Sequence, residues 1–142
     1  MVRLKHRYLI CQALDESTQQ LQIDEKDVIF SLRTCIQTLF GDVGAGEFGN
    51  SAVVKLFDPK SKIFVLRVSR DFEIDARFAL SCVNNIKKSP AIIRTIATSG
   101  SARNCRKSLT HCFDQLTHCA PTDVEMHSLK ATYSDLMNSY DL

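Results

Sequence analysis

Residues 51–70 read SAVVKLFDPKSKIFVLRVSR, and the fold depends on this stretch. Two apolar runs rich in β-branched and aromatic side chains flank the turn-forming residues DPKS at 58–61. This pattern is typical of a β-hairpin. We therefore predict strands over 51–58 and 62–70, joined by a tight turn. What surrounds the hairpin in the chain decides how its sheet is completed.

The first strand of the chain is predicted at residues 1–14, which read MVRLKHRYLICQAL. Successive side chains of a strand face opposite ways, so Arg3, Lys5 and Arg7 form a row of cations on one face. The strand changes from charged to apolar along its length. It therefore predicts a sheet with one solvated, cationic edge that suits phosphate groups.

A helix is predicted between this strand and the hairpin, after the polar connection DESTQQLQI. Asp24 is placed to cap it, and Asp27 is a weak form of the capping-box residue. Apolar residues recur at helical spacing as far as Leu39, and Gly41 ends the helix. Residues 41–50, GDVGAGEFGN, are predicted to form a flexible, glycine-rich connection.

A second helix is predicted after the hairpin, from a cap at Asp71 to about Lys88, where Pro90 stops it. A fourth strand is expected over 91–100, and a third helix over 102–118. Pro121 ends that helix, and a last short helix is predicted to begin at Thr122 or Asp123. The expected buried residues of the second helix are Phe72, Ile74, Phe78, Ala79 and Cys82 or Val83. Those of the third helix are Ala102, Cys105, Leu109, Cys112 or Phe113, Leu116 and Cys119.

The order strand–helix–strand–strand–helix–strand predicts an α+β fold of the ferredoxin-like (RRM-like) split βαβ type. We expect a four-stranded antiparallel sheet with two packed helices, plus C-terminal helices. Right-handed crossovers place the fourth strand beside the first. We divide the chain into a ferredoxin-like RNA- or partner-binding domain over 1–112 and a helical, acidic extension over 113–142.

Composition indicates one ordinary soluble domain, with 142 residues, 44% hydrophobic and 24% charged. No apolar run approaches the roughly 20 residues of a membrane span, and no secretory signal is expected. Six cysteines without a CxxC pair therefore indicate reduced thiols. Charge is uneven, since residues 1–113 hold 17 Lys and Arg against 11 Asp and Glu, whereas residues 114–142 hold one against five. A basic body with an acidic tail indicates an anionic partner.

Three motifs that could carry chemistry are set aside. The GxGxxG match at 44–49 follows a helix and precedes a strand, the reverse of a dinucleotide site. The pairs at 111–112 and 118–119, each His-Cys, place the thiols on the apolar side of a helix, unlike a zinc site. No sequence feature brings a nucleophile and a base together. We predict no catalytic residue, no metal ligand and no cofactor in this chain.

The signal for RNA is distributed over several cationic residues. Three of them occupy the first turns of the third helix, where cations are mildly disfavoured unless an anion is bound. The third strand offers only Phe64 for base stacking, so backbone and shape contacts are the expected mode. A solvated charged face is the alternative reading. The predicted phosphate contacts are Arg3, Lys5, Arg7, Arg67, Arg70, Arg103, Arg106 and Lys107.

Three segments resemble one protein family over about residues 1–112. They are the opening MVRLKHRYL, the hairpin SAVVKLFDPKSKIFVLRVSR, and the turn and helix SGSARNCRKSL, with its pattern at Gly100, Arg103 and Cys105. The chain resembles the Processing-of-Precursor subunit five family of ribonuclease P and ribonuclease MRP proteins, of eukaryotic and archaeal type. A related subunit of the same particles shares the fold, but the KHRYL opening favours this family.

The resemblance implies a non-catalytic subunit of an RNA-based endonuclease. The catalyst would be the RNA, which removes the 5′ leader of precursor tRNA, and the MRP form acts on precursor ribosomal RNA. It also implies pairing with a TIM-barrel-like subunit, contact with other particle subunits, no membrane, and residence in the nucleus and nucleolus. Two alternatives stay open: a ferredoxin-like protein–protein module without RNA, and an acylphosphatase-like hydrolase. The connection DESTQQLQIDE contains no glycine for an anion cradle, which argues against the hydrolase.

Overall fold

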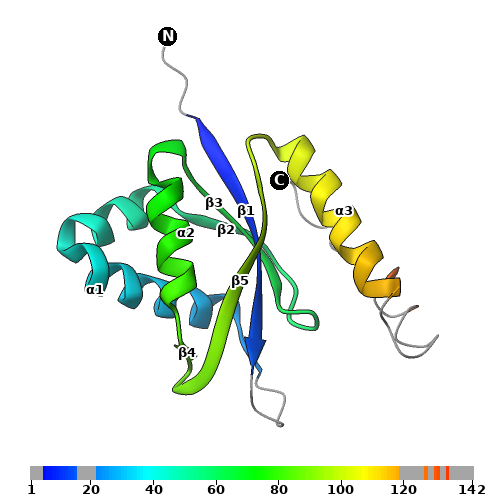
Figure 1. Cartoon of the computed structure of the whole chain (residues 1–142), viewed down its shortest axis with the longest axis horizontal. Coiled ribbons are helices and arrows are strands. Elements are labelled where there is room, and N and C mark those ends of the chain that lie inside the picture. Colours follow the sequence, from blue (N-terminus) through cyan, green and yellow to red (C-terminus); the bar gives the residue numbers. More distant parts are fainter. Residues whose placement is uncertain (1–4, 16–21, 119–126, 128–129, 132–133, 135–142) are drawn as a thin grey trace.

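The structure is a computed structural model that describes residues 5–15, 22–118, 127, 130–131 and 134. Its strands form one sheet, and its helices pack against that sheet (Figure 1). They are β1 (His6–Asp15), α1 (Glu25–Ser51), β2 (Val53–Phe57), β3 (Ile63–Ser69), a 3-10 turn (Arg70–Phe72), α2 (Glu73–Cys82), β4 (Asn85–Ile86), β5 (Ser89–Ser99) and α3 (Ala102–His118).

The sheet is antiparallel throughout and has the order β2-β3-β1-β5-β4. The predicted hairpin of β2 and β3 is confirmed, and so is the position of the fourth predicted strand, β5, beside β1. The arrangement is consistent with a ferredoxin-like plan. The predicted count of four strands is wrong, because β4 adds a short fifth strand beside the start of β5.

The two faces of the sheet carry different helices. Figure 1 shows α1 and α2 on one side and α3 on the other. Strand side chains alternate between the faces, so Leu9 and Cys11 of β1 join the cluster under α1 and α2, whereas Ile10 joins the cluster under α3. The third helix buries the face that its spacing predicts, through Cys105, Leu109, Cys112 and Phe113, with Leu116 partly buried.

Residues 41–50 do not form the predicted loop. Gly41 adopts φ 71°, which ends the first helical segment as expected, but a second segment continues to Ser51. This segment is anchored because Phe48 is buried and its ring lies 6.4 Å from that of Phe72. Gly44 allows the close turn, since a Cβ there would lie 2.3 Å from the Cβ of Phe40. Tertiary packing outweighs the low helix propensity of the glycines.

The second helix is shorter than predicted. It ends at Cys82, because Val83 is extended and the Asn residues that follow have low helix propensity, and the chain turns back at Lys87 and Lys88 with φ 52° and 63°. Pro90 lies inside β5 and does not stop a helix.

The predicted buried face of the second helix is also partly wrong. Ile74 and Phe78 are exposed, while Ala76 and Leu80 are buried beside Ala79. The helix begins one residue later than expected, with Phe72 in place of Asp71 as its cap, and its small alanine positions face the sheet.

The predicted start of α1 is confirmed. The backbone N–H of Asp24 donates to the carboxylate of Asp27 at 2.9 Å, and Lys87 lies 3.0 Å from the same carboxylate. These contacts hold the pKa of Asp27 below its usual range, the Asp24 hydrogen bond having the largest effect.

Within the described residues, no helix combines the length and apolarity needed to cross a bilayer. The predicted start of the last helix, at 122 or 123, lies outside the described residues.

Candidate nucleic-acid interface

Four elements meet at one end of the sheet. Tyr8 of β1 pairs with Arg67 of β3 on one side and with Ser99 of β5 on the other. The backbone N–H of Arg70 donates to the carbonyl of Lys5 at 2.9 Å, which joins the start of β1 to the end of β3. The helix α3 begins three residues after Ser99. We call this region the basic end, defined by Lys5, Arg7, Arg67, Arg70 and Arg103.

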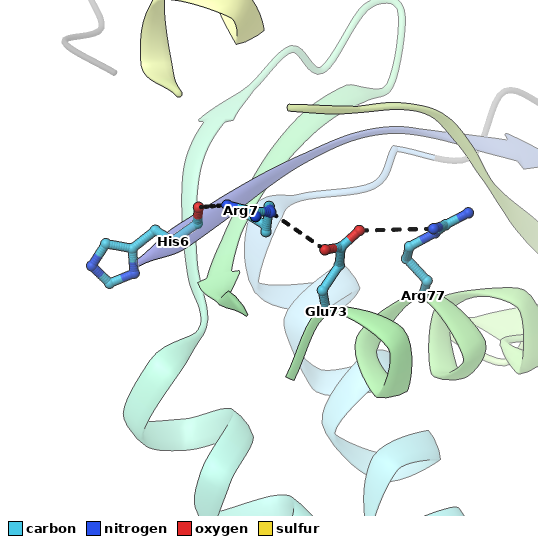
Figure 2. Close-up of polar contacts among 4 residues, drawn as sticks. All are labelled: His6, Arg7, Glu73 and Arg77. Carbon is cyan, nitrogen blue, oxygen red and sulfur yellow. Dashed lines mark hydrogen bonds and ion pairs between the residues drawn. The ribbon is translucent and has the colours of Figure 1, made fainter. Parts of the chain in front are cut away.

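Arg7 is held in place from the α2 side of the sheet (Figure 2). Its Nε lies 3.5 Å from Oε2 of Glu73, and Oε1 of Glu73 lies 3.8 Å from Nη1 of Arg77. Nη1 of Arg7 donates to the backbone carbonyl of His6 at 3.2 Å. The Arg7 side chain keeps 27% of its surface exposed. It is therefore a positioned cation that still faces solvent.

Gly100 brings the loop before α3 against Arg7. A Cβ at Gly100 would lie 3.3 Å from Nη1 of Arg7, so the guanidinium rests on the glycine backbone. The approach confirms that the basic stretch of β1 and the start of α3 come together, as the fourth strand's position suggested. It is the N-terminal end of β1 that reaches this loop.

Arg67 and His6 point to the other face of the sheet, the one that carries α3. Figure 2 shows the His6 ring directed away from Glu73. Nε of Arg67 and Nδ1 of His6 are both buried, and neither has a hydrogen-bond partner among the described residues. The Nε–H of Arg67 is a donor that lacks an acceptor among these residues, and leaving such a buried group unpaired is costly.

The helical spacing of α3 places its basic residues on the solvent-exposed side of the helix. Cys105 and Leu109 are buried against the sheet, which leaves the intervening basic residues on the exposed side. At the helix start, Oγ of Ser101 accepts the N–H of Asn104 at 3.3 Å. The exposed basic residues of the first turns are Arg103, Arg106 and Lys107.

Of the other predicted contacts, Lys5 and Arg70 are exposed, and Arg3 lies outside the described residues. Reasoning from the sequence missed Glu73, which orients Arg7, and the contact between Gly100 and Arg7. The spacing of Glu73 and Arg77 is a visible i,i+4 pair, but only the tertiary structure brings Arg7 to it.

The His-Cys pair at 111–112, which the sequence excluded as a zinc site, lies outside the basic end. His111 is exposed and lies 3.1 Å from Nε2 of Gln115, whereas Cys112 is buried and its pKa is raised by that burial. The described residues contain no group of three or more His, Cys, Asp or Glu side chains that could hold a metal ion. The chemistry that this arrangement offers is anion binding by fixed cations and backbone N–H groups.

The fold and the basic end define a small α+β protein with a cationic surface where β1, β3 and α3 meet. Comparison of the sequence with known families places it more narrowly. The sequence pattern of the Rpp14/Pop5 family matches residues 7–110. The chain belongs to the Rpp14/Pop5 family.

Relatives from distant organisms agree with this assignment. The chain is 34% identical over 113 residues to the ribonuclease P/MRP protein subunit POP5 of Schizosaccharomyces pombe, covering 72% of this chain and 81% of that protein. It is 27% identical over 114 residues to the Homo sapiens subunit of that name, covering 77% and 70%. The fold resembles a chain of the yeast ribonuclease MRP cryo-EM structure, with a TM-score of 0.57 and 14% identity, over 84% of this chain and 99% of that one.

Proposed function

We propose that this chain is a non-catalytic protein subunit of ribonuclease P and ribonuclease MRP. In this role it supports the catalytic RNA in removing the 5′ leader of precursor tRNA and in processing precursor ribosomal RNA. Membership of the Rpp14/Pop5 family and the names of the relatives support the proposal. The observation that carries it is the convergence of cations from β1, β3 and α3 on the loop at Gly100.

The RNA contacts in this proposal are made to phosphates. Positioned cations such as Arg7 lose little conformational freedom when they bind, because Glu73 already orients the side chain. Phosphate contacts fix position without reading sequence, which suits a protein that braces a folded RNA. The proposed contacts are Arg3, Lys5, Arg7, Arg67, Arg70, Arg103, Arg106 and Lys107.

The proposal also covers the protein partners of the chain, its location in the cell and its domain boundary. We include a TIM-barrel-like subunit of the same enzyme and other particle subunits as protein partners, and residence in the nucleus and nucleolus. We also retain the ferredoxin-like classification, and the division at 112–113 between a binding domain and an acidic C-terminal extension. The family match at 7–110 supports treating that region as the conserved unit.

The direct test is to sequence the RNA that co-purifies with the tagged full-length chain from its own cells. We expect enrichment of the ribonuclease P and MRP RNAs over total RNA. Their absence from a purification that retains the folded chain would overturn the proposal.

The residue assignment is tested by salt dependence. If about five phosphates are neutralised, log affinity should fall against log salt with a slope of about −3.5 to −4.5. An Arg3→Ala, Lys5→Ala, Arg7→Ala variant should be shallower by about 2 to 3, since each contact contributes about 0.7 to 0.9. The matched control removes three exposed cations elsewhere, Lys26, Arg33 and Lys60. An unchanged slope in the first variant would sink the assignment.

The hydrolase alternative has its own test. A glycine-bearing anion cradle between first strand and first helix is what an acylphosphatase-like enzyme needs, and the sequence between β1 and α1 has no glycine. We expect no hydrolysis of acyl phosphates above the rate in buffer. Turnover that co-purifies with the chain would reopen that alternative.

A further inference from the structure

The strand β5 has one open backbone edge. It pairs with β1 from Ser99 to Ala91, but on its other side β4 reaches only Ser89 and Pro90. The N–H of Ala91 is used by the carbonyl of Asn84 at 3.2 Å. From Ile92 onward, no strand among the described residues covers the outer edge of β5. An edge strand offers unpaired N–H and C=O groups to another extended chain.

Apolar side chains gather along the same edge. A groove between α2 and β5 is lined by Leu14, Ile74, Phe78, Ile92 and Ile93. Ile74 is 78% exposed, Phe78 55% and Ile92 49%. Scattered exposed apolar residues are ordinary, but three beside one open strand edge form a continuous surface for a partner.

The positive charge beside this groove indicates the chemistry of the partner. Arg77 and Arg94, both exposed, line the groove. Arg94 lies on the α3 face of the sheet, where its Nη2 donates to Oε1 of Gln12 at 2.8 Å. Alternate side chains of an added strand would face α2 and α3 in turn. A strand with apolar side chains toward α2 and acidic side chains on the other face would therefore pair its acidic groups with Arg94.

We infer that the outer edge of β5 is a docking site for an extended segment of another protein, with alternating apolar and acidic side chains. This inference rests on the proposed function, because it takes that protein to be a member of the same assembly. The segment adds a strand to the sheet, and its apolar side chains enter the groove against Ile74 and Phe78. A bulge at Ile96, where the β1–β5 register shifts, limits the new pairing to about Ile92–Thr95.

The test is amide hydrogen exchange on the tagged full-length chain, free and in the purified assembly. We expect the amides of 92–95 to exchange at least about tenfold more slowly in the assembly, and to stay slow after nuclease digestion of the RNA. Equal exchange in the two states would overturn the inference. Protection that disappears with the RNA assigns the edge to RNA, and concentration-dependent protection of the free chain assigns it to a second copy; either result overturns it. If the ribonuclease RNAs are absent but a bound protein still protects 92–95, the proposed function fails and the docking site stands.

Variants give a second readout. Ile74→Ser with Phe78→Ser should return exchange at 92–95 to within about twofold of the free chain. The matched control is Phe30→Ser, an α1 side chain that is 72% exposed and lines a different groove. The ring of Phe78 lies 6.5 Å from that of Phe40, so the double variant could lose stability. Arg94→Glu changes an exposed side chain, so it avoids that problem and should lower retention of the partner about tenfold. Full protection in Arg94→Glu would contradict an acidic partner.

Discussion

The two faces of the sheet differ in how many of the described side chains they bury. The face under α1 and α2 buries side chains from two helices and most of the strands, and Leu9, Phe64 and Leu66 of that cluster are at most 1% exposed. Among the residues that the structure describes, the face under α3 is covered by that helix alone. The first face therefore supplies most of the stability, while the second positions α3 and its cations beside the basic end.

Arg7 links the two faces. Its ion pair with Glu73 belongs to the α2 side, and its contact with Gly100 belongs to the loop that leads into α3. We therefore expect binding at the basic end and stability of the fold to respond to different substitutions.

The largest effect is expected from removing one leucine from each face. Leu66→Ala should lower the free energy of unfolding by about 4 to 5 kcal/mol, and Leu109→Ala by about 2 to 3, because the cavity under a single helix can collapse more fully. Both leucines are 1% exposed, so the pair is matched in burial. Denaturant unfolding measures both values. Equal losses would contradict the distinction between the faces.

Thiol reactivity compares the faces without destabilising either. Burial raises the pKa of Cys11, under α1 and α2, to about 12, and that of Cys105, under α3, to about 11. Both thiols are fully buried, so alkylation requires the covering helices to open, and Cys105 under α3 should be alkylated at least about tenfold faster than Cys11. Mass spectrometry after iodoacetamide, in a Cys119→Ser variant, gives the two rates. The exposed thiol of Cys82 serves as the fast internal reference.

A change at Gly100 should affect binding more than stability. Gly100→Val pushes the Arg7 guanidinium away, because a Cβ there already lies 3.3 Å from Nη1. We expect a salt slope shallower by about 0.7 to 0.9, the loss of one phosphate contact. Gly49→Val is the control, since a Cβ at Gly49 would meet nothing within 4 Å. A slope equal to that of the control would show that Arg7 does not touch phosphate.

The smallest effect concerns pH and the start of α1. The pKa of Asp27 is lowered in the folded chain, so its contribution is present above the unfolded pKa, about 3.9, and disappears as pH falls through the folded value. Asp27→Asn should lose about 0.5 to 1 kcal/mol at pH 7, and the difference from the natural chain should shrink at acid pH. Thermal unfolding from pH 7 to pH 2 measures it. A difference that stays constant with pH would mean that the carboxylate charge is not responsible.

Local patterns predicted much of the molecule. The β-hairpin, the capped start of α1, the apolar face of α3 and the neighbourhood of β1 and β5 all follow from periodicity and connection rules, and all are confirmed. The errors lie where tertiary packing outweighs local preference. Glycines at 41–50 indicate a loop, yet Phe48 packs against Phe72 and holds a helix there. The end of α2 also differs from the prediction, because the pairing of residues 85–86 with β5 exists only in the folded chain.

The same division applies to the basic end. By itself, the sequence determined which residues carry positive charge and which faces of β1 and α3 they occupy, because these follow from charge and from the periods of strand and helix. Only the tertiary structure decided that Glu73 orients Arg7, that Gly100 lies against it, and that β5 has an open edge beside Ile74 and Phe78. Such contacts join residues far apart in the chain, and their existence depends on how the helices and the sheet pack together.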